Sequence, residues 1–229
     1  MRFLFLLLCV LSAEVFAKKP LCTHAVLYVD TAKPLSLHPT QLDIGMRAAE
    51  HRRDKILAMH ERERELYLIR KAPKVVIGPE GKRYLIDGHH LVFAAYLAGI
   101  EELPIRVVAD WSQKKHFWRK MRRRGYLHLV DQTGRAHTRD KLPTDILGFG
   151  DDEYRSLAYF ARRQKAFKKK QKLYSEFAWA NFYRMRIPLG EGDAGFEAAL
   201  RMAVQISLAM DAAYLPGYRG DDNPAPAKN

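Results

Sequence analysis

Apolar and polar positions alternate along residues 20–110 in short runs that predict strands separated by helices. A loosely alternating run at 21–29 predicts a strand, and a charged stretch at 45–72 predicts a long helix. We expect that helix to bury an apolar stripe of Ile56, Leu57, Leu66 and Ile69. Runs at 75–77 and 84–86 flank a Pro-Glu-Gly-Lys turn and predict a β-hairpin.

After the hairpin, an alanine-rich helix is predicted at 91–98 and is ended by Gly99. Further predicted elements are a strand at 105–109, a basic helix at 112–124 and a strand at 126–130. Beyond residue 142 the strand pattern fades, and helices are predicted from 151 to about 168, at 175–185 and at 194–214. The pattern therefore indicates an α+β unit followed by a helical extension.

The first 17 residues have the pattern of a secretory signal peptide. A charged start precedes an apolar run at 3–11, and Val15-Phe16-Ala17 offers small residues for cleavage. That run is shorter than the roughly 20 residues that span a bilayer. We therefore expect a soluble protein, exported to the periplasm or the medium. Cys22 would be its only cysteine, so no internal disulfide is expected.

The chain carries 39 Lys and Arg residues against 26 Asp and Glu residues, a net charge of +13. This balance favours anionic partners such as nucleic acid, nucleotides or an acidic envelope surface, with general solubility as the simpler explanation.

The junction of the second hairpin strand with the helix after it carries the clearest candidate chemistry. Asp87-Gly88-His89-His90 places a carboxylate, a flexible glycine and two imidazoles at a helix start, where unpaired N–H groups favour anions. The histidines are candidates for phosphate binding, acid–base catalysis or metal ligation. Alternatively, Asp87 only caps the helix.

Several ordered motifs together resemble the ParB/sulfiredoxin superfamily, and in particular its ParB-like nuclease branch. His38-Pro39-Thr40-Gln41 is similar to the first ParB motif, Asn-Pro-x-Gln, and Asp87–His90 stands where ParB carries its Gly-Glu-Arg-Arg box. Similar downstream motifs lie at 117–118, 142–143, 152–158 and 176–182. The resemblance implies a small mixed sheet with helices at 18–138, followed by a packed helical extension at 139–219. The tail at 220–229 is polar and contains prolines, so we expect it to be disordered.

The departures from that superfamily narrow the chemistry. Sulfiredoxin has its catalytic cysteine at the place of His89, so reduction of sulfinic acids is excluded. Relatives that phosphorylate free serine carry an arginine where this chain has Leu91. The resemblance still implies a pocket that holds phosphate at the helix start.

A second motif, Tyr154-Arg155-Ser156, follows two aspartates at a helix start. Arg155 suits bidentate phosphate recognition, and the two aspartates are candidates for holding a divalent cation. Asp151 is most simply a helix cap. Glu176 lies on an aromatic helix face, and we expect it to pair with Arg155 or to act as a base. We expect Thr40, Gln41, Gly88, Arg155 and Ser156 to bind phosphate, with Tyr154, Glu176 and Lys55 in support.

The leading hypothesis is an exported nuclease or other phosphoesterase. One of His89 and His90 would activate water or protonate the leaving oxygen, and Asp87 would orient it. Mg²⁺ or Mn²⁺ is compatible with this chemistry, but no metal-ligand set is evident. The alternatives are a nucleotide hydrolase or small-molecule phosphotransferase, and a non-catalytic basic module for nucleic acid or envelope polyanions.

Overall fold

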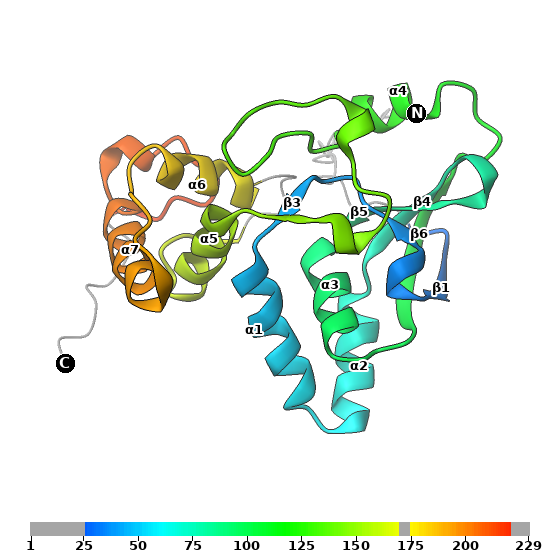
Figure 1. Cartoon of the computed structure of the whole chain (residues 1–229), viewed down its shortest axis with the longest axis horizontal. Coiled ribbons are helices and arrows are strands. Elements are labelled where there is room, and N and C mark those ends of the chain that lie inside the picture. Colours follow the sequence, from blue (N-terminus) through cyan, green and yellow to red (C-terminus); the bar gives the residue numbers. More distant parts are fainter. Residues whose placement is uncertain (1–25, 170–174, 221–229) are drawn as a thin grey trace, which may run out of the picture.

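A computed structural model describes residues 26–169 and 175–220. A five-stranded mixed sheet with helices on both faces lies beside a group of three helices (Figure 1). This arrangement confirms the predicted α+β fold with a mixed sheet and a helical C-terminal part.

The sheet has the order β1-β6-β4-β5-β2, in which β4–β6 and β2–β5 are the parallel neighbours. A separate parallel pair joins β3 and β7. The strands are β1 (Tyr28–Ala32), β2 (Leu37–His38), β3 (Asp43–Ile44), β4 (Lys74–Ile77), β5 (Arg83–Asp87), β6 (Leu103–Asp110) and β7 (Gly150–Asp151). The helices are α1 (Met46–Leu57), α2 (Glu61–Lys71), α3 (His89–Leu97), α4 (Phe117–Arg123), α5 (Glu153–Arg163), α6 (Ser175–Arg184) and α7 (Gly192–Ile206).

The predicted hairpin is confirmed as β4 and β5, which pair antiparallel with Val76 opposite Tyr84. Successive side chains of a strand point to opposite faces, and both faces are apolar here. Val75 and Leu85 pack toward α1 and α3, whereas Val76 and Tyr84 pack toward α4. The sheet is therefore buried on both sides, and its strand ends deliver residues into the interior.

The single helix expected at 45–72 is wrong. The chain turns between Leu57 and Glu61, and α1 and α2 form a helical hairpin beside α3. Ile56 is buried as predicted, but the other three members of the expected stripe are exposed; Tyr67 and Leu68 are buried in their place. One straight helix would carry these residues past α3, whereas the turn lets both helices bury an apolar face.

The strand expected at 126–130 is also wrong: the segment forms two isolated bridges, Gln41–His128 and Val130–Ala136. Tyr126 stacks on Trp111, and this aromatic packing holds the segment without a ladder. The helix expected from residue 112 begins only at Phe117, because His116 takes a left-handed conformation with φ of 60°.

The helices α5, α6 and α7 share one hydrophobic cluster built around Trp179 and Tyr183. Helix α6 agrees with its prediction, but α5 ends at Arg163 and α7 at Ile206, earlier than expected. Within 26–169 and 175–220, no helix has the length and apolarity to cross a membrane. The predicted signal peptide, Cys22 and almost all of the predicted tail lie outside the described residues.

Candidate functional site

Helices α1 and α5 begin side by side because the strands before them are paired. Ile44 of β3 lies opposite Asp151 of β7, and each strand continues directly into a helix. The Asp151 carboxylate accepts a hydrogen bond from the Met46 N–H of α1 at 2.9 Å. Asp152, rather than Asp151, caps α5 by accepting from Tyr154 N at 3.1 Å. The expectation that Asp151 caps its own helix is therefore wrong.

Gly45 allows these two helix starts to approach each other. A Cβ at Gly45 would lie 2.5 Å from Ser156 Oγ and 2.6 Å from Ser156 N. The Ser156 hydroxyl accepts from Ala48 N at 3.2 Å, so this residue joins α5 to α1. The Gly45 N–H donates to His90 Nε2 at 3.0 Å. This approach therefore brings the starts of α1, α3 and α5 together.

His89 lies inside the protein and is only 2% exposed. Its Nε2 is 3.4 Å from Thr40 N and 3.3 Å from Thr40 Oγ1, while that hydroxyl donates to Leu85 O at 2.6 Å. Burial, and then the nearby Arg155 charge, lower the pKa of His89 to about 3. The same two causes lower the pKa of His90 well below its usual value. Both imidazoles are therefore neutral at pH 7.

Gly88 makes the turn between β5 and α3 with φ of 94°, a conformation that favours glycine. A Cβ there would also lie 2.7 Å from Pro73 Cβ. Asp87 points outward: its side chain is 63% exposed and pairs with Lys74 Nζ at 3.5 Å. Among the described residues it neither caps α3 nor bonds to an imidazole.

Arg155 is the central group of the site. Its guanidinium stacks on Phe177, with Cζ 3.3 Å from the ring centroid, and the residue is 5% exposed. Nε and Nη1 are buried and have no hydrogen-bond partner in the described part of the chain. Burial lowers the pKa of Arg155 to about 10, so it stays charged at neutral pH. Its charge helps to lower the pKa values of His89, His90 and His128.

Sequence reasoning missed His128 as a member of this cluster. Its backbone N–H donates to Thr40 O at 2.9 Å, and the centroid of its ring lies 3.6 Å from the centroid of the Phe177 ring. Burial lowers its pKa to about 4. Beside it, Gln41 is 8% exposed, and its Oε1 has no hydrogen-bond partner among the described residues. The available signal was one polar residue inside the apolar run 126–130.

The three supporting residues lie elsewhere or are occupied. Glu176 pairs with Arg162 Nε at 2.7 Å rather than with Arg155, although its charge raises the pKa of Arg155. The Tyr154 hydroxyl donates to Ile187 O at 2.7 Å. Lys55 lies over the Tyr67 ring between α1 and α2. The structure thus gathers Thr40, Gln41, His89, His90 and Arg155, and adds His128 and Phe177.

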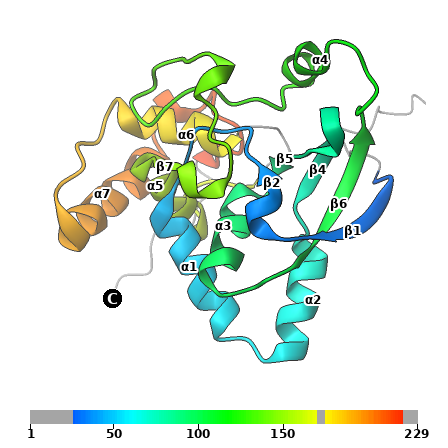
Figure 2. The ribbon, with the colours of Figure 1, turned by 45° about the vertical axis from the view of Figure 1, so that its right-hand side comes forward.

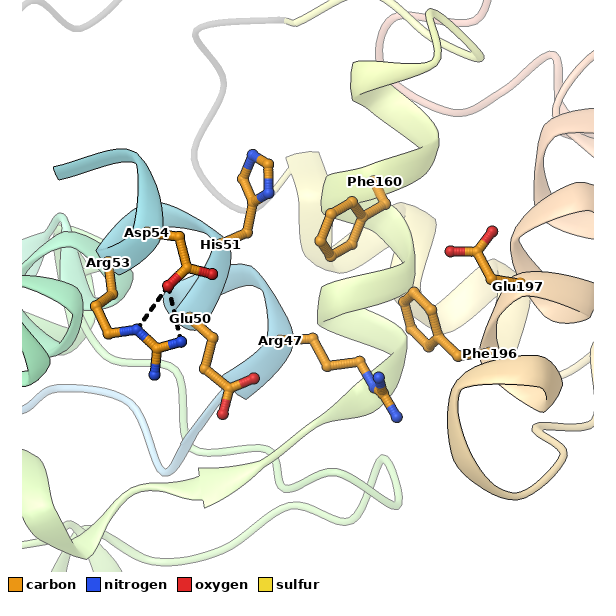
Figure 3. Close-up of a pocket in the computed structure, with 8 residues that line it drawn as sticks. All are labelled: Arg47, Glu50, His51, Arg53, Asp54, Phe160, Phe196 and Glu197. Atoms are coloured by element: carbon orange, nitrogen blue, oxygen red, sulfur yellow. Dashed lines mark hydrogen bonds and ion pairs between the residues drawn. The ribbon is translucent and has the colours of Figure 1, made fainter. Parts of the chain in front are cut away.

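An open cavity of about 240 Å³ lies apart from this cluster, between α1, α5 and α7 (Figure 3). None of the predicted site residues lines it. Its walls are formed by Arg47, Glu50, His51, Arg53, Asp54, Phe160, Phe196 and Glu197. Three of its charged groups already have partners, since Arg53 pairs with Asp54 and Arg47 with Asp193 and Glu153. In the described residues, no three His, Cys, Asp or Glu side chains form a metal-binding group.

Comparison with known proteins places the chain in a family. Residues 32–185, more than half of the chain, match the family described as Putative ParB-like nuclease. The crystal structure of protein Atu1540 from Agrobacterium tumefaciens is similar, with 31% identity and a TM-score of 0.76. The similarity covers 84% of this chain and 98% of that one. No curated protein is significantly similar. The chain therefore belongs to the ParB-like nuclease family, as the motifs at 38–41 and 87–90 predicted.

Proposed function

We propose that this protein is exported and hydrolyses a phosphoester whose phosphate is held by Arg155 of α5, beside the histidines that begin α3. The observation that carries this proposal is the Arg155 guanidinium, which belongs to a residue that is 5% exposed and has two nitrogen donors without a hydrogen-bond partner in the part of the chain that the structure describes. A buried cation without hydrogen-bond partners is costly in free energy, and an anionic ligand would remove that cost. Guanidinium donors match phosphate oxygens bidentately.

The surroundings of Arg155 suit a bound phosphate group. Three neutral imidazoles lie within its electrostatic range, and the carboxylate of Asp152 is already paired with Arg184 at 2.6 Å. A bound phosphate group carries negative charge and therefore raises the pKa values of the neutral imidazoles beside it, because an opposite charge favours the protonated form. Gln41, which forms a bridge with His128, is buried, and its side-chain oxygen has no hydrogen-bond partner among the described residues.

In the proposed reaction, water attacks phosphorus while the bond to the leaving oxygen breaks. One neutral imidazole of the cluster accepts the proton from water, and a second imidazole, protonated when phosphate binds, donates a proton to the leaving oxygen. Arg155 stabilises the charge on the remaining phosphate oxygens. The exposed Asp87 has no part in this scheme, which differs from the role expected from the sequence.

The test measures hydrolysis of bis(p-nitrophenyl) phosphate, plasmid DNA, RNA and ATP, each with and without Mg²⁺ or Mn²⁺. We expect turnover of at least one substrate, and a loss of about 100-fold or more in Arg155→Met and in His89→Ala/His90→Ala. The exposed Arg201→Gln on α7 is the control for removal of one positive charge. Unchanged rates in both site variants would overturn the mechanism. Binding of nucleic acid without turnover would favour the non-catalytic module.

A further inference from the structure

Residues 112–141, the basic segment, hold most of the net charge of the protein. This segment has ten Lys and Arg residues and two Asp residues, a net charge of +8 within a chain total of +13. It comprises α4, the turn after it and the loop that returns toward β7. The α1–α2 hairpin, by contrast, has eight Lys and Arg against five Asp and Glu at 46–71.

The cations of the basic segment point to solvent. Phe117 and Met121 of α4 are buried against the sheet, which turns the basic side chains outward. Nine of the ten cations are exposed: Lys114, Lys115, Arg119, Arg122, Arg123, Arg124, Arg135, Arg139 and Lys141. Among described residues, the segment's ion pair joins Asp131 to His137, and none of the ten cations is paired. On the α1–α2 hairpin, Arg53 and Arg62 pair with carboxylates.

The basic segment is also physically part of the candidate site. His128 belongs to the basic segment, and its backbone N–H donates to Thr40 O at 2.9 Å. Gln132 N donates to the buried Asp43 carboxylate at 2.6 Å, and Arg184 Nε donates to Gln132 O at 2.8 Å. Figures 1 and 2 show α4 and its following loop along the upper end of the molecule, opposite the α1–α2 turn. An anion bound along this end would therefore approach the Arg155 site.

The side chains of the segment favour a polyanion over a lipid surface. A peripheral membrane surface needs apolar side chains that insert between headgroups, and none of the exposed large apolar residues lies at 112–141. Instead, Arg139 lies over Trp118, with Cζ 4.7 Å from the ring centroid, and Lys120 lies over Trp111. Rows of cations supported by aromatic rings suit a phosphate backbone.

We propose that the basic segment binds nucleic acid and leads its phosphate backbone to Arg155. This inference rests on the proposed function and names its substrate as a polynucleotide rather than a mononucleotide. Each phosphate contact releases counterions, so the affinity depends on salt in proportion to the number of contacts.

The test compares two triple variants with equal loss of charge. Arg119→Gln/Arg122→Gln/Arg123→Gln removes three exposed cations of α4; Arg62→Gln/Arg70→Gln/Lys71→Gln removes three exposed cations of α2. Fluorescence anisotropy measures binding of 20-nucleotide single-stranded DNA, duplex DNA and RNA across a salt series. We expect the α4 variant to bind at least about tenfold more weakly, with a salt slope reduced by about 2 to 3. The α2 variant should change little.

Two further measurements separate this inference from the proposed function. Bis(p-nitrophenyl) phosphate has a single phosphate and lacks the further phosphates that the exposed cations of α4 would bind, so its hydrolysis should be unchanged in the α4 variant. The wild type could show no hydrolysis of any substrate while, of the two triple variants, only the α4 variant loses DNA binding. In that case the proposed function fails and the assignment of the nucleic-acid-binding surface stands. Equal losses of nucleic-acid affinity in both triple variants would overturn the assignment of binding to the basic segment. Binding only to vesicles of phosphatidylglycerol and phosphatidylcholine would also overturn it.

Discussion

The Arg155 cluster and the open cavity between α1, α5 and α7 differ in how their charges are satisfied. The cavity is accessible, and its Arg47, Arg53 and Asp54 already have partners. The Arg155 cluster is buried, yet two nitrogens of Arg155 and the Gln41 oxygen have no partner among the described residues. Open space alone would direct attention to the cavity, whereas unsatisfied polar atoms direct it to the cluster.

This difference has an energetic meaning. A surface ion pair contributes about 0 to 1 kcal/mol to the free energy of unfolding, so the ion pairs in the cavity walls change stability little. A buried cation without hydrogen-bond partners lowers the free energy of unfolding by several times that amount, and a bound anionic ligand can offset this loss. The cluster is therefore where we expect function and stability to oppose each other.

The largest expected effect is that of Arg155→Met. Methionine fills a similar volume beside Phe177 but has no charge and no donors, so phosphate binding should weaken by about 100-fold or more. The apo protein should lose no stability, and its melting temperature should stay the same or rise, because a buried unpaired charge is removed. Calorimetric titration with inorganic phosphate and thermal unfolding measure the two quantities.

Arg155→Lys sharpens this result. Lysine keeps the charge but not the planar pair of donors, so it should bind phosphate more weakly than the wild type and more tightly than Arg155→Met. A clear fall in melting temperature for Arg155→Met, without a change in phosphate binding, would mean that Arg155 is only a structural residue.

Gly45→Ala tests the approach of the helices that builds the cluster. The added methyl group would lie 2.5 Å from Ser156 Oγ, so α1 and α5 must separate. We expect a loss of about 2–3 kcal/mol in the free energy of unfolding, measured in urea, together with weaker phosphate binding. Gly99→Ala is the control, because its Cβ meets nothing within 4 Å and only its φ of +72° is strained. Its cost should be about 1 kcal/mol. Equal costs would contradict a tight contact at Gly45.

The parts of the fold that the sequence predicted are local. The β4–β5 hairpin follows from alternation around a Pro-Glu-Gly turn, and the start of α3 follows from the Asp-Gly-His-His junction. Family motifs added Thr40 and Gln41. The fold brings Thr40 beside His89 and pairs Gln41 with His128. In each case a short segment carries its own signal through spacing, turn residues or a motif.

The parts that the sequence did not predict depend on contacts between distant segments. The Asp151 side chain binds the start of α1, 105 residues earlier in the chain, because β3 pairs with β7. His128 reaches the site through a bridge to Gln41, although its own segment resembles a strand. The turn between α1 and α2 exists because both helices pack near α3. No local pattern encodes these partners, because tertiary packing selects them.

Acid should weaken the protein through the buried imidazoles of the cluster. Histidines of the unfolded chain take up protons near pH 6.5, whereas His89 resists protonation until about pH 3 and His128 until about pH 4. The unfolded state therefore binds more protons in this range, and stability falls as the pH drops from 7 toward 4. His89→Asn should reduce that loss by about 2 to 3 kcal/mol, measured by urea unfolding at pH 7 and 4.5. The exposed His60→Asn serves as a control, and an equal reduction there would contradict the assignment.

The smallest effect is expected from the open cavity. Arg53→Gln/Glu197→Gln removes one charge of each sign from its walls and leaves the net charge unchanged. Because Arg53 takes part in a solvent-facing pair with Asp54 and Glu197 is exposed, unfolding should change by less than about 1 kcal/mol. Phosphate affinity and turnover should stay within about twofold, since neither residue contacts the Arg155 cluster. A tenfold fall in either quantity would reverse the comparison: the cavity with its charges paired would then be the ligand site, and the unpartnered donors of Arg155 would need another explanation.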